Sequence, residues 1–159
     1  MKTLEQEFAK QIYDQVKAYG DLYPKEDLGK NKVRKQYGSM AHKLPILVRT
    51  AGLTQALAFV DSRKEPQRDL LKHIAGVVAG CEKDEFLRMS REAELQEYVY
   101  LTRRTMLALK WFKRFAQSVL EVEATDEAMT EVDHERLSTQ CSRSNFQAPS
   151  RFAYRVMAG

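Results

Sequence analysis

The chain has 159 residues, of which 43% are hydrophobic and 30% charged, and its formal net charge is +4 at pH 7. This length predicts one domain that buries a core without disulfides or metals, and no apolar run is long enough to cross a bilayer. The two cysteines, Cys81 and Cys141, fit no metal or redox motif, so we expect a soluble, cytoplasmic protein with reduced thiols.

The first half of the chain predicts two helices and a loop between them. Four apolar residues at helical spacing predict a helix over residues 4 to about 19, with Thr3 as its N-cap: Leu4, Phe8, Ile12 and Val16. Helix-breaking residues mark the loop that follows: Gly20, Pro24 and Gly29. The second helix carries its apolar residues on one side: Val33, Tyr37, Met40 and Leu44. Pro45 is expected to kink or restart this helix, because the residue before a proline avoids helical geometry.

Further helices are predicted downstream. One begins after Gly52, and the next has Pro66 in its first turn and ends at Gly80. The longest helix is predicted from about Ser90 to Val122, since it contains neither proline nor glycine. At 100° per residue, its core-facing positions are expected to be Leu95, Tyr98, Thr102, Thr105, Leu109, Phe112, Ala116 and Val119.

The periodicity therefore predicts an all-α fold, a compact helical bundle of about five to six helices with one long C-terminal helix and a less regular tail. We expect the bundle to span residues 1–122 and a partly ordered extension to span 123–159. The extension begins with six acidic residues: Glu123, Asp126, Glu127, Glu131, Asp133 and Glu135. It then carries only basic charges: Arg136, Arg143, Arg151 and Arg155. Residues 128–137 are compatible with a short helix, and residues 152–156 with a strand.

Two long windows, residues 28–60 and 98–120, contain no aspartate or glutamate. Unbalanced positive charge opposes folding by self-repulsion unless a polyanion or another subunit neutralises it, so nucleic acid or an acidic partner is the first hypothesis. On the second helix, helical spacing places a mainly basic set of residues on the side away from the apolar residues: Lys32, Lys35, Ser39, His42 and Lys43, joined by Arg49. A second basic stripe lies on the long helix: Arg103, Lys110 and Arg114. A merely solvated charged face is the alternative.

No catalytic, metal or cofactor site is predicted. The chain has three histidines, His42, His73 and His134, and no metal, phosphate-loop or nucleophile motif. We expect His73 to be a packed residue of its helix. The carboxylates of Glu92, Glu94 and Glu97 fit solvated first turns of a helix better than a metal site. Four aromatic residues offer base stacking, but their apolar surroundings favour core packing: Tyr37, Tyr98, Tyr100 and Trp111.

Three blocks of sequence resemble a known family. Residues 35–59, with Lys43-Leu-Pro45 followed by Gly52-Leu-Thr-Gln-Ala-Leu-Ala-Phe59, resemble the signature of the small α-helical subunit of the Cmr complex, the type III-B CRISPR effector or RAMP module. Residues 70–74 are similar to the next helix of that family. Residues 98–104 and 111–116 are similar to its closing helix. The resemblance covers about residues 4–122, and nothing is carried over to the tail.

The resemblance implies a non-catalytic subunit in antiviral defence. In the family, small subunits stack along the inner side of a filament of backbone RAMP subunits, where they help to hold CRISPR RNA and target RNA. The implied partners are these RNAs, the backbone RAMP subunits, the large subunit and further copies of the chain itself, with no membrane or small-molecule substrate. Matching positions suggest an RNA-binding role for Lys35, Lys43, Arg49, Arg103, Arg104, Lys113 and Arg114. The helical faces, not the family, add Lys32 and Lys110. The alternative is a structural adaptor whose basic faces bind acidic protein neighbours.

Overall fold

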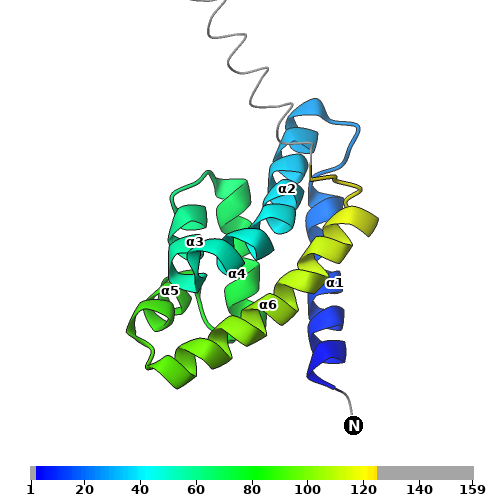
Figure 1. Ribbon diagram of the computed structural model, residues 1–159. Helices are drawn as coiled ribbons and strands as arrows, with labels where there is room; N and C mark the ends of the chain where they lie inside the picture. Colours follow the sequence, from blue (N-terminus) through cyan, green and yellow to red (C-terminus); the bar gives the residue numbers. More distant parts are fainter. Residues whose placement is uncertain (1–2, 125–159) are drawn as a thin grey trace, which may run out of the picture. The chain divides into compact units, whose positions relative to one another are not determined.

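The computed structural model describes residues 3–124, which form six α-helices and contain no strand (Figure 1). In chain order the helices are α1 (Leu4–Leu22), α2 (Leu28–Ala51), α3 (Leu53–Asp61), α4 (Glu65–Val78), α5 (Lys83–Glu92) and α6 (Leu95–Ser118). The all-α helical bundle predicted from the sequence is confirmed.

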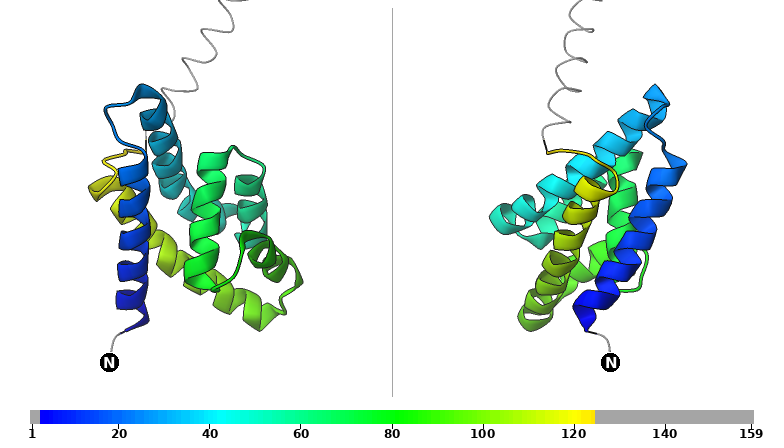
Figure 2. Two further views of the ribbon diagram at one scale, coloured as in Figure 1. Left: turned by 180° about the vertical axis from the view of Figure 1, so that it is seen from behind. Right: turned by 90° about the vertical axis from the view of Figure 1, so that its right-hand side faces the viewer.

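α4 and α6 hold the bundle together. α6 packs against α1, α2 and α4, and α4 packs against α1, α2, α3 and α5. Figures 1 and 2 show α1 and α4 on the same side of α6, with α3 and α5 gathered at the other end of the bundle from the turn between α1 and α2. All six helices contribute large side chains to the core, among them Ile12, Tyr37, Leu57, Ile74, Phe86 and Phe112.

Local signals fix the start of α1 and both ends of α4. The Thr3 hydroxyl accepts a hydrogen bond from the Gln6 amide, and the Gln6 side chain accepts one from the Thr3 amide, which completes a capping box. α4 has Pro66 in its first turn and is followed by Gly80 in the left-handed region at φ 66°. These helix boundaries agree with the sequence signals, whereas the predicted loop is shorter than expected, since Gly20 belongs to α1 and Gly29 to α2.

α2 does not restart at Pro45. The helix runs from its N-cap, Asp27, through Pro45 to Ala51, so no separate helix begins at the proline. Proline lacks the amide hydrogen that would bond to the Ala41 carbonyl, which costs the helix one hydrogen bond. Leu44 and Val48, on either side of Pro45, are both buried, and their burial favours continuation of the helix. Of the two alternatives predicted at Pro45, the restart is wrong, because packing on both sides of the proline favours one continuous helix. The kink stays a prediction.

The long helix predicted from about Ser90 to Val122 corresponds mainly to α6, which begins later, at Leu95, and ends earlier, at Ser118, whereas Ser90 belongs to α5. α5 ends at Glu92 and α6 begins at Leu95, and the two residues between them, Ala93 and Glu94, have extended backbone with ψ of 136° and 158°. No side chain from residue 91 to 97 is buried, so no packing holds a helix together there. A continuous helix over residues 83–118 would be about 54 Å long and would extend past its partners. The break lets α5 fold back onto α3 and α4.

The core-facing stripe of α6 also differs from the prediction. Leu95, expected in the core, is 76% exposed. The buried residues of this helix are Leu101, Thr105, Ala108, Leu109, Phe112 and Ala116. On α2, Ser39 and His42 were expected to face outward and are instead buried, at 0% and 5% exposure.

The predictions for the tail, including the helix at 128–137 and the strand at 152–156, lie outside the described residues. The division into 1–122 and 123–159 stays a prediction. Among residues 3–124, no helix combines the length and the apolar character that a membrane span requires.

Candidate nucleic-acid interface

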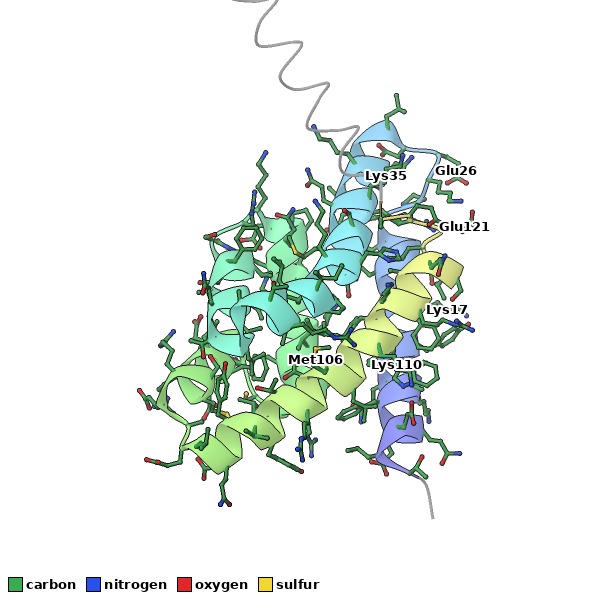
Figure 3. The ribbon with its side chains drawn as sticks, in the orientation of Figure 1. Lys17, Glu26, Lys35, Met106, Lys110 and Glu121 are labelled. Atoms are coloured by element: carbon green, nitrogen blue, oxygen red, sulfur yellow. The ribbon has the colours of Figure 1, made fainter. Side chains whose placement is uncertain are left out.

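The nine predicted RNA-binding residues lie on α2 and α6, which pack against each other. Both helices lie in front in the view of Figure 3, where Lys35 marks α2 and Lys110 marks α6. The structure therefore packs together two helices, each from a different acid-free stretch of sequence, although three other helices lie between them along the chain.

On α2, three of the four predicted cations are exposed. Lys32, Lys43 and Arg49 are exposed, and Lys35 is half-buried. Arg49 lies in the last turn, where a positive charge interacts favourably with the negative end of the helix dipole. At the other end, the Asp27 carboxylate accepts hydrogen bonds from the amides of Gly29 and Lys30 at 3.0 and 3.2 Å. α2 itself contains no acidic residue.

On α6, four of the five predicted cations are exposed: Arg103, Lys110, Lys113 and Arg114. Lys110 forms an ion pair with Glu5 of α1, with 3.1 Å between Nζ and Oε1. Both side chains are largely solvated, so this pair contributes little to stability and leaves Lys110 available to other anions. Next to it lies a depression of about 500 Å³ lined by Glu5, Lys110, Trp111, Lys113, Arg114 and Gln117.

Arg104 has a different environment from the other eight. It is half-buried, and its guanidinium donates a hydrogen bond to the Tyr100 hydroxyl at 3.0 Å. The guanidinium carbon also lies 5.4 Å from the ring centroid of Phe8 on α1, within the range of a cation–π contact. The Tyr100 bond lies within α6, whereas the Phe8 contact connects α6 to α1 and gives Arg104 a packing role whatever its part in RNA binding.

Sequence reasoning missed Arg34 and misplaced His42. The Arg34 guanidinium donates hydrogen bonds to the carbonyls of Leu120 and Val119 at 2.9 and 3.1 Å. The His42 Nε2 lies 2.8 Å from the Val122 carbonyl, and since a carbonyl only accepts, Nε2 carries the hydrogen.

These two residues and Gly38 between them form a clamp on the chain that leaves α6. Arg34, Gly38 and His42 are spaced four residues apart, so they share one face of α2. We call this set the C-terminal clamp. Its two polar members bond to carbonyls just after the end of α6, where a helix leaves carbonyls without amide partners. The four-residue spacing of these side chains is visible in the sequence. The carbonyls that Arg34 and His42 contact, however, lie 80 to 86 positions further along the chain.

A further ion pair follows the end of α6. Lys25, in the loop between α1 and α2, pairs with Glu121, and this contact lowers the pKa of the Glu121 carboxyl. Figure 3 shows Glu121 beside that loop. Glu121 has a positive φ of 51°, an uncommon conformation for a residue other than glycine.

The described histidines are structural. His73 Nδ1 lies 2.8 Å from the hydroxyl of Tyr37, whose ring stacks on Tyr19 with 4.1 Å between centroids. Burial lowers the pKa of His73 and raises the pKa of Tyr37 well above its usual value. Both shifts favour the neutral forms of this pair, as packing requires.

No other feature of the described residues resembles an active site. A groove of about 1010 Å³ lies between the end of α4, α5 and the first half of α6, and its lining includes neither histidine nor cysteine. Among residues 3–124, no group of three or more histidine, cysteine, aspartate or glutamate side chains is placed to hold a metal ion.

Comparisons with known proteins agree with the architecture. Residues 4–119 match the family model described as CRISPR-associated protein (Cas_Cmr5). The CRISPR system Cmr subunit Cmr5 of Thermus thermophilus is 43% identical over 122 residues, which cover 76% of this chain and 99% of that protein. A crystal structure of a CRISPR-associated Cmr5 family protein from the same organism has a TM-score of 0.66 and 43% identity, and it covers 77% of this chain and 100% of its own. The chain therefore belongs to the CRISPR-associated Cmr5 family.

Proposed function

We propose that this protein is a non-catalytic small subunit of a CRISPR RNA-guided type III-B (Cmr) effector complex in antiviral defence. Family membership supports this role. The environments of His42 and His73, which hold the fold together, agree with a subunit that does no chemistry. In the complex the chain stacks along the filament of backbone RAMP subunits, beside the large subunit and further copies of itself, and helps to hold guide and target RNA.

The observation that carries the RNA-binding role is the exposure of cations on two helices that pack together. Among residues 3–124, the exposed side chains of Lys32, Arg49, Arg103, Lys113 and Arg114 have no acidic partner. Lysine and arginine on rigid helices neutralise phosphates, and arginine donates to two phosphate oxygens at once. Contacts of this kind position the RNA backbone without reading its sequence, which suits a subunit that must accept any guide.

The α2 cations can be tested by charge reversal. Changing Lys32, Lys43 and Arg49 together to glutamate leaves the core intact, because all three side chains are exposed. We expect capture of target RNA by the assembled complex, measured by filter binding, to fall by at least about tenfold, and the loss to shrink as salt is raised. A matched control reverses three exposed cations of α1 and α5, namely Lys10, Lys17 and Arg91. Normal capture by the α2 variant would show that these residues do not bind RNA.

The alternative, a structural adaptor, is favoured by a specific observation. Lys25 and Lys110 pair with the carboxylates of Glu121 and Glu5, so the cations of this chain do accept acidic protein partners. If the adaptor role is correct, the α2 variant loses co-purification with the backbone subunit even after nuclease treatment, whereas the control variant retains it. If the RNA role is correct, nuclease-treated complexes keep the variant.

A further inference from the structure

We propose that the acidic segment of residues 121–127 docks on the basic face of α2 and competes there with RNA. The competition with RNA rests on the proposed function of that face, whereas the docking does not. The segment begins just after residue 119, where the match to the family model ends. It therefore lies at the edge of the region that the family model covers and extends beyond that region.

The C-terminal clamp determines where this segment starts. The Val122 carbonyl accepts the hydrogen bond from His42, and the Val122 side chain packs against Gly38, where a Cβ would come within 2.7 Å of it. Val122 is 2% exposed. The chain after α6 is thus fixed on α2 between the positions of Gly38 and His42.

Basic residues of α2 lie within reach of that point. Lys35 precedes Gly38 by three residues and Lys43 directly follows His42, so each is within one helical turn of the anchored Val122. Lys32 is six residues before Gly38, about 9 Å along the helix axis. The five residues 123–127 span up to about 17 Å when extended, which is enough to reach all three lysines.

The charges are complementary. The segment carries four carboxylates, Glu121, Glu123, Asp126 and Glu127, and no basic residue. The first of them already pairs with Lys25. Carboxylates and phosphates are alternative partners for a lysine ammonium group, so a segment held beside these lysines at high effective concentration competes with RNA for them. The expected consequence is weak RNA binding by the isolated chain and stronger binding where the complex supplies RNA at high local concentration.

Lysine acetylation tests the docking without RNA. In the full chain, Glu123→Gln, Asp126→Asn and Glu127→Gln are combined, and a matched control combines Glu92→Gln, Glu94→Gln and Glu97→Gln at the α5–α6 junction. Pairing with a carboxylate lowers the fraction of a lysine in its reactive neutral form, so we expect Lys32, Lys35 and Lys43 to be acetylated about threefold or more faster in the segment variant. Lys10 and Lys17 on α1 serve as internal references, and peptide mass spectrometry gives the rates.

RNA binding tests the competition. The probe is a short single-stranded RNA of mixed sequence, and its affinity is measured by fluorescence anisotropy over a range of salt concentrations. If two lysines are released to phosphates, the slope of log K against log salt should steepen by about 1.4, with binding about tenfold tighter at low salt. The control variant has the same net charge as the segment variant and should remain close to the unchanged chain.

The outcomes separate this inference from the proposed function. Equal acetylation of the α2 lysines in all three proteins overturns the docking. Faster acetylation in the segment variant without RNA binding by any of the proteins supports the docking and overturns the RNA role of the face. If the slower acetylation of the α2 lysines in the unchanged chain is lost on dilution, the segment of a second copy covers these lysines. That result would overturn docking within one chain.

Discussion

Gly38 is the residue at which α2 and the chain after α6 come closest. It is buried, and a Cβ at this position would lie 2.7 Å from the Val122 Cβ and 2.9 Å from its Cγ1. Both contacts are shorter than packed side chains tolerate, so the space allows only glycine. The glycine is needed for close approach rather than for an unusual backbone conformation.

Gly38→Ala should therefore destabilise the protein. Overpacking against Val122 costs about 1–3 kcal/mol, which outweighs the roughly 1 kcal/mol that alanine gains over glycine inside a helix. The free energy of unfolding, measured by urea denaturation, is expected to fall. Gly76→Ala in α4 is the matched control, because a Cβ there meets nothing within 4 Å. Its expected effect is a gain of up to about 1 kcal/mol. A loss in the control, or a gain at Gly38, would contradict this account of the packing.

At the scale of single residues, helical spacing predicted the exposure of three α2 cations correctly but misplaced Ser39, His42 and Leu95. Lys32, Lys43 and Arg49 are exposed as the helical spacing indicated. Arg34 and His42 were missed or misplaced because their partners, the carbonyls after the end of α6, are distant in sequence. No periodicity within one helix contains that information.

α3 depends on a side chain from another helix for its N-terminus. Its N-cap is Gly52, which has a positive φ of 87° and no side chain that could accept a hydrogen bond. The Tyr98 hydroxyl of α6 fills that role and accepts a hydrogen bond from the Leu53 amide at 2.9 Å. Tyr98, which the sequence assigned to the core, thus caps a neighbouring helix.

Tyr98→Phe should weaken the junction between α3 and α6. The Leu53 amide would lose its acceptor in a partly buried site, which costs about 1–3 kcal/mol of unfolding free energy. Tyr100→Phe is the control, because Tyr100 is 60% exposed and its hydroxyl only accepts a hydrogen bond from Arg104. We expect the control to change stability by less than about 0.5 kcal/mol in urea unfolding. Similar losses in both variants would show that Tyr98 does not act as a cap.

At the scale of elements, helix starts and stops encoded locally could be predicted. Thr3, Pro66 and Gly80 lie where the sequence signals placed them. The continuation of α2 through Pro45 and the break between α5 and α6 depend on packing partners elsewhere in the bundle. Local signals could not reveal either of them.

For the molecule as a whole, the Tyr37–His73 pair makes stability depend on pH. The groups that face His73 are the Tyr37 hydroxyl, the Tyr19 ring and two charged neighbours on α4, Asp69 and Lys72. Burial is the largest effect and lowers the pKa of His73 in the folded state. The unfolded chain then binds more protons below about pH 6.5, so stability is lost as the pH falls from that value toward the lower folded pKa.

His73→Gln should reduce this loss. Glutamine keeps an acceptor for the Tyr37 hydroxyl but does not titrate. Urea unfolding at about pH 7.5 and about pH 5.5 should show a smaller drop in the variant, by about 1.4 kcal/mol for each unit of pKa depression that the pH range covers. Carboxylates elsewhere titrate equally in both proteins, so the difference isolates His73. Identical drops would mean that His73 does not contribute.

The bundle as a whole was predictable in class and family but not in its interior arrangement. Helical periodicity indicated the all-α fold, and the blocks at residues 35–59, 70–74, 98–104 and 111–116 pointed to the family. The RNA-binding assignment stays a prediction, because exposure of a cation on α2 or α6 does not by itself distinguish phosphate from carboxylate as its partner.

The C-terminal clamp also has a consequence for the order of folding. Its hydrogen bonds join residues 80 to 86 positions apart, so they form only after most of the chain has been brought together. Contacts that form late contribute little to the folding transition state, and the free energy they add appears mainly as slower unfolding. Arg34, Gly38 and His42 should therefore govern how long the folded subunit persists more than how fast it forms.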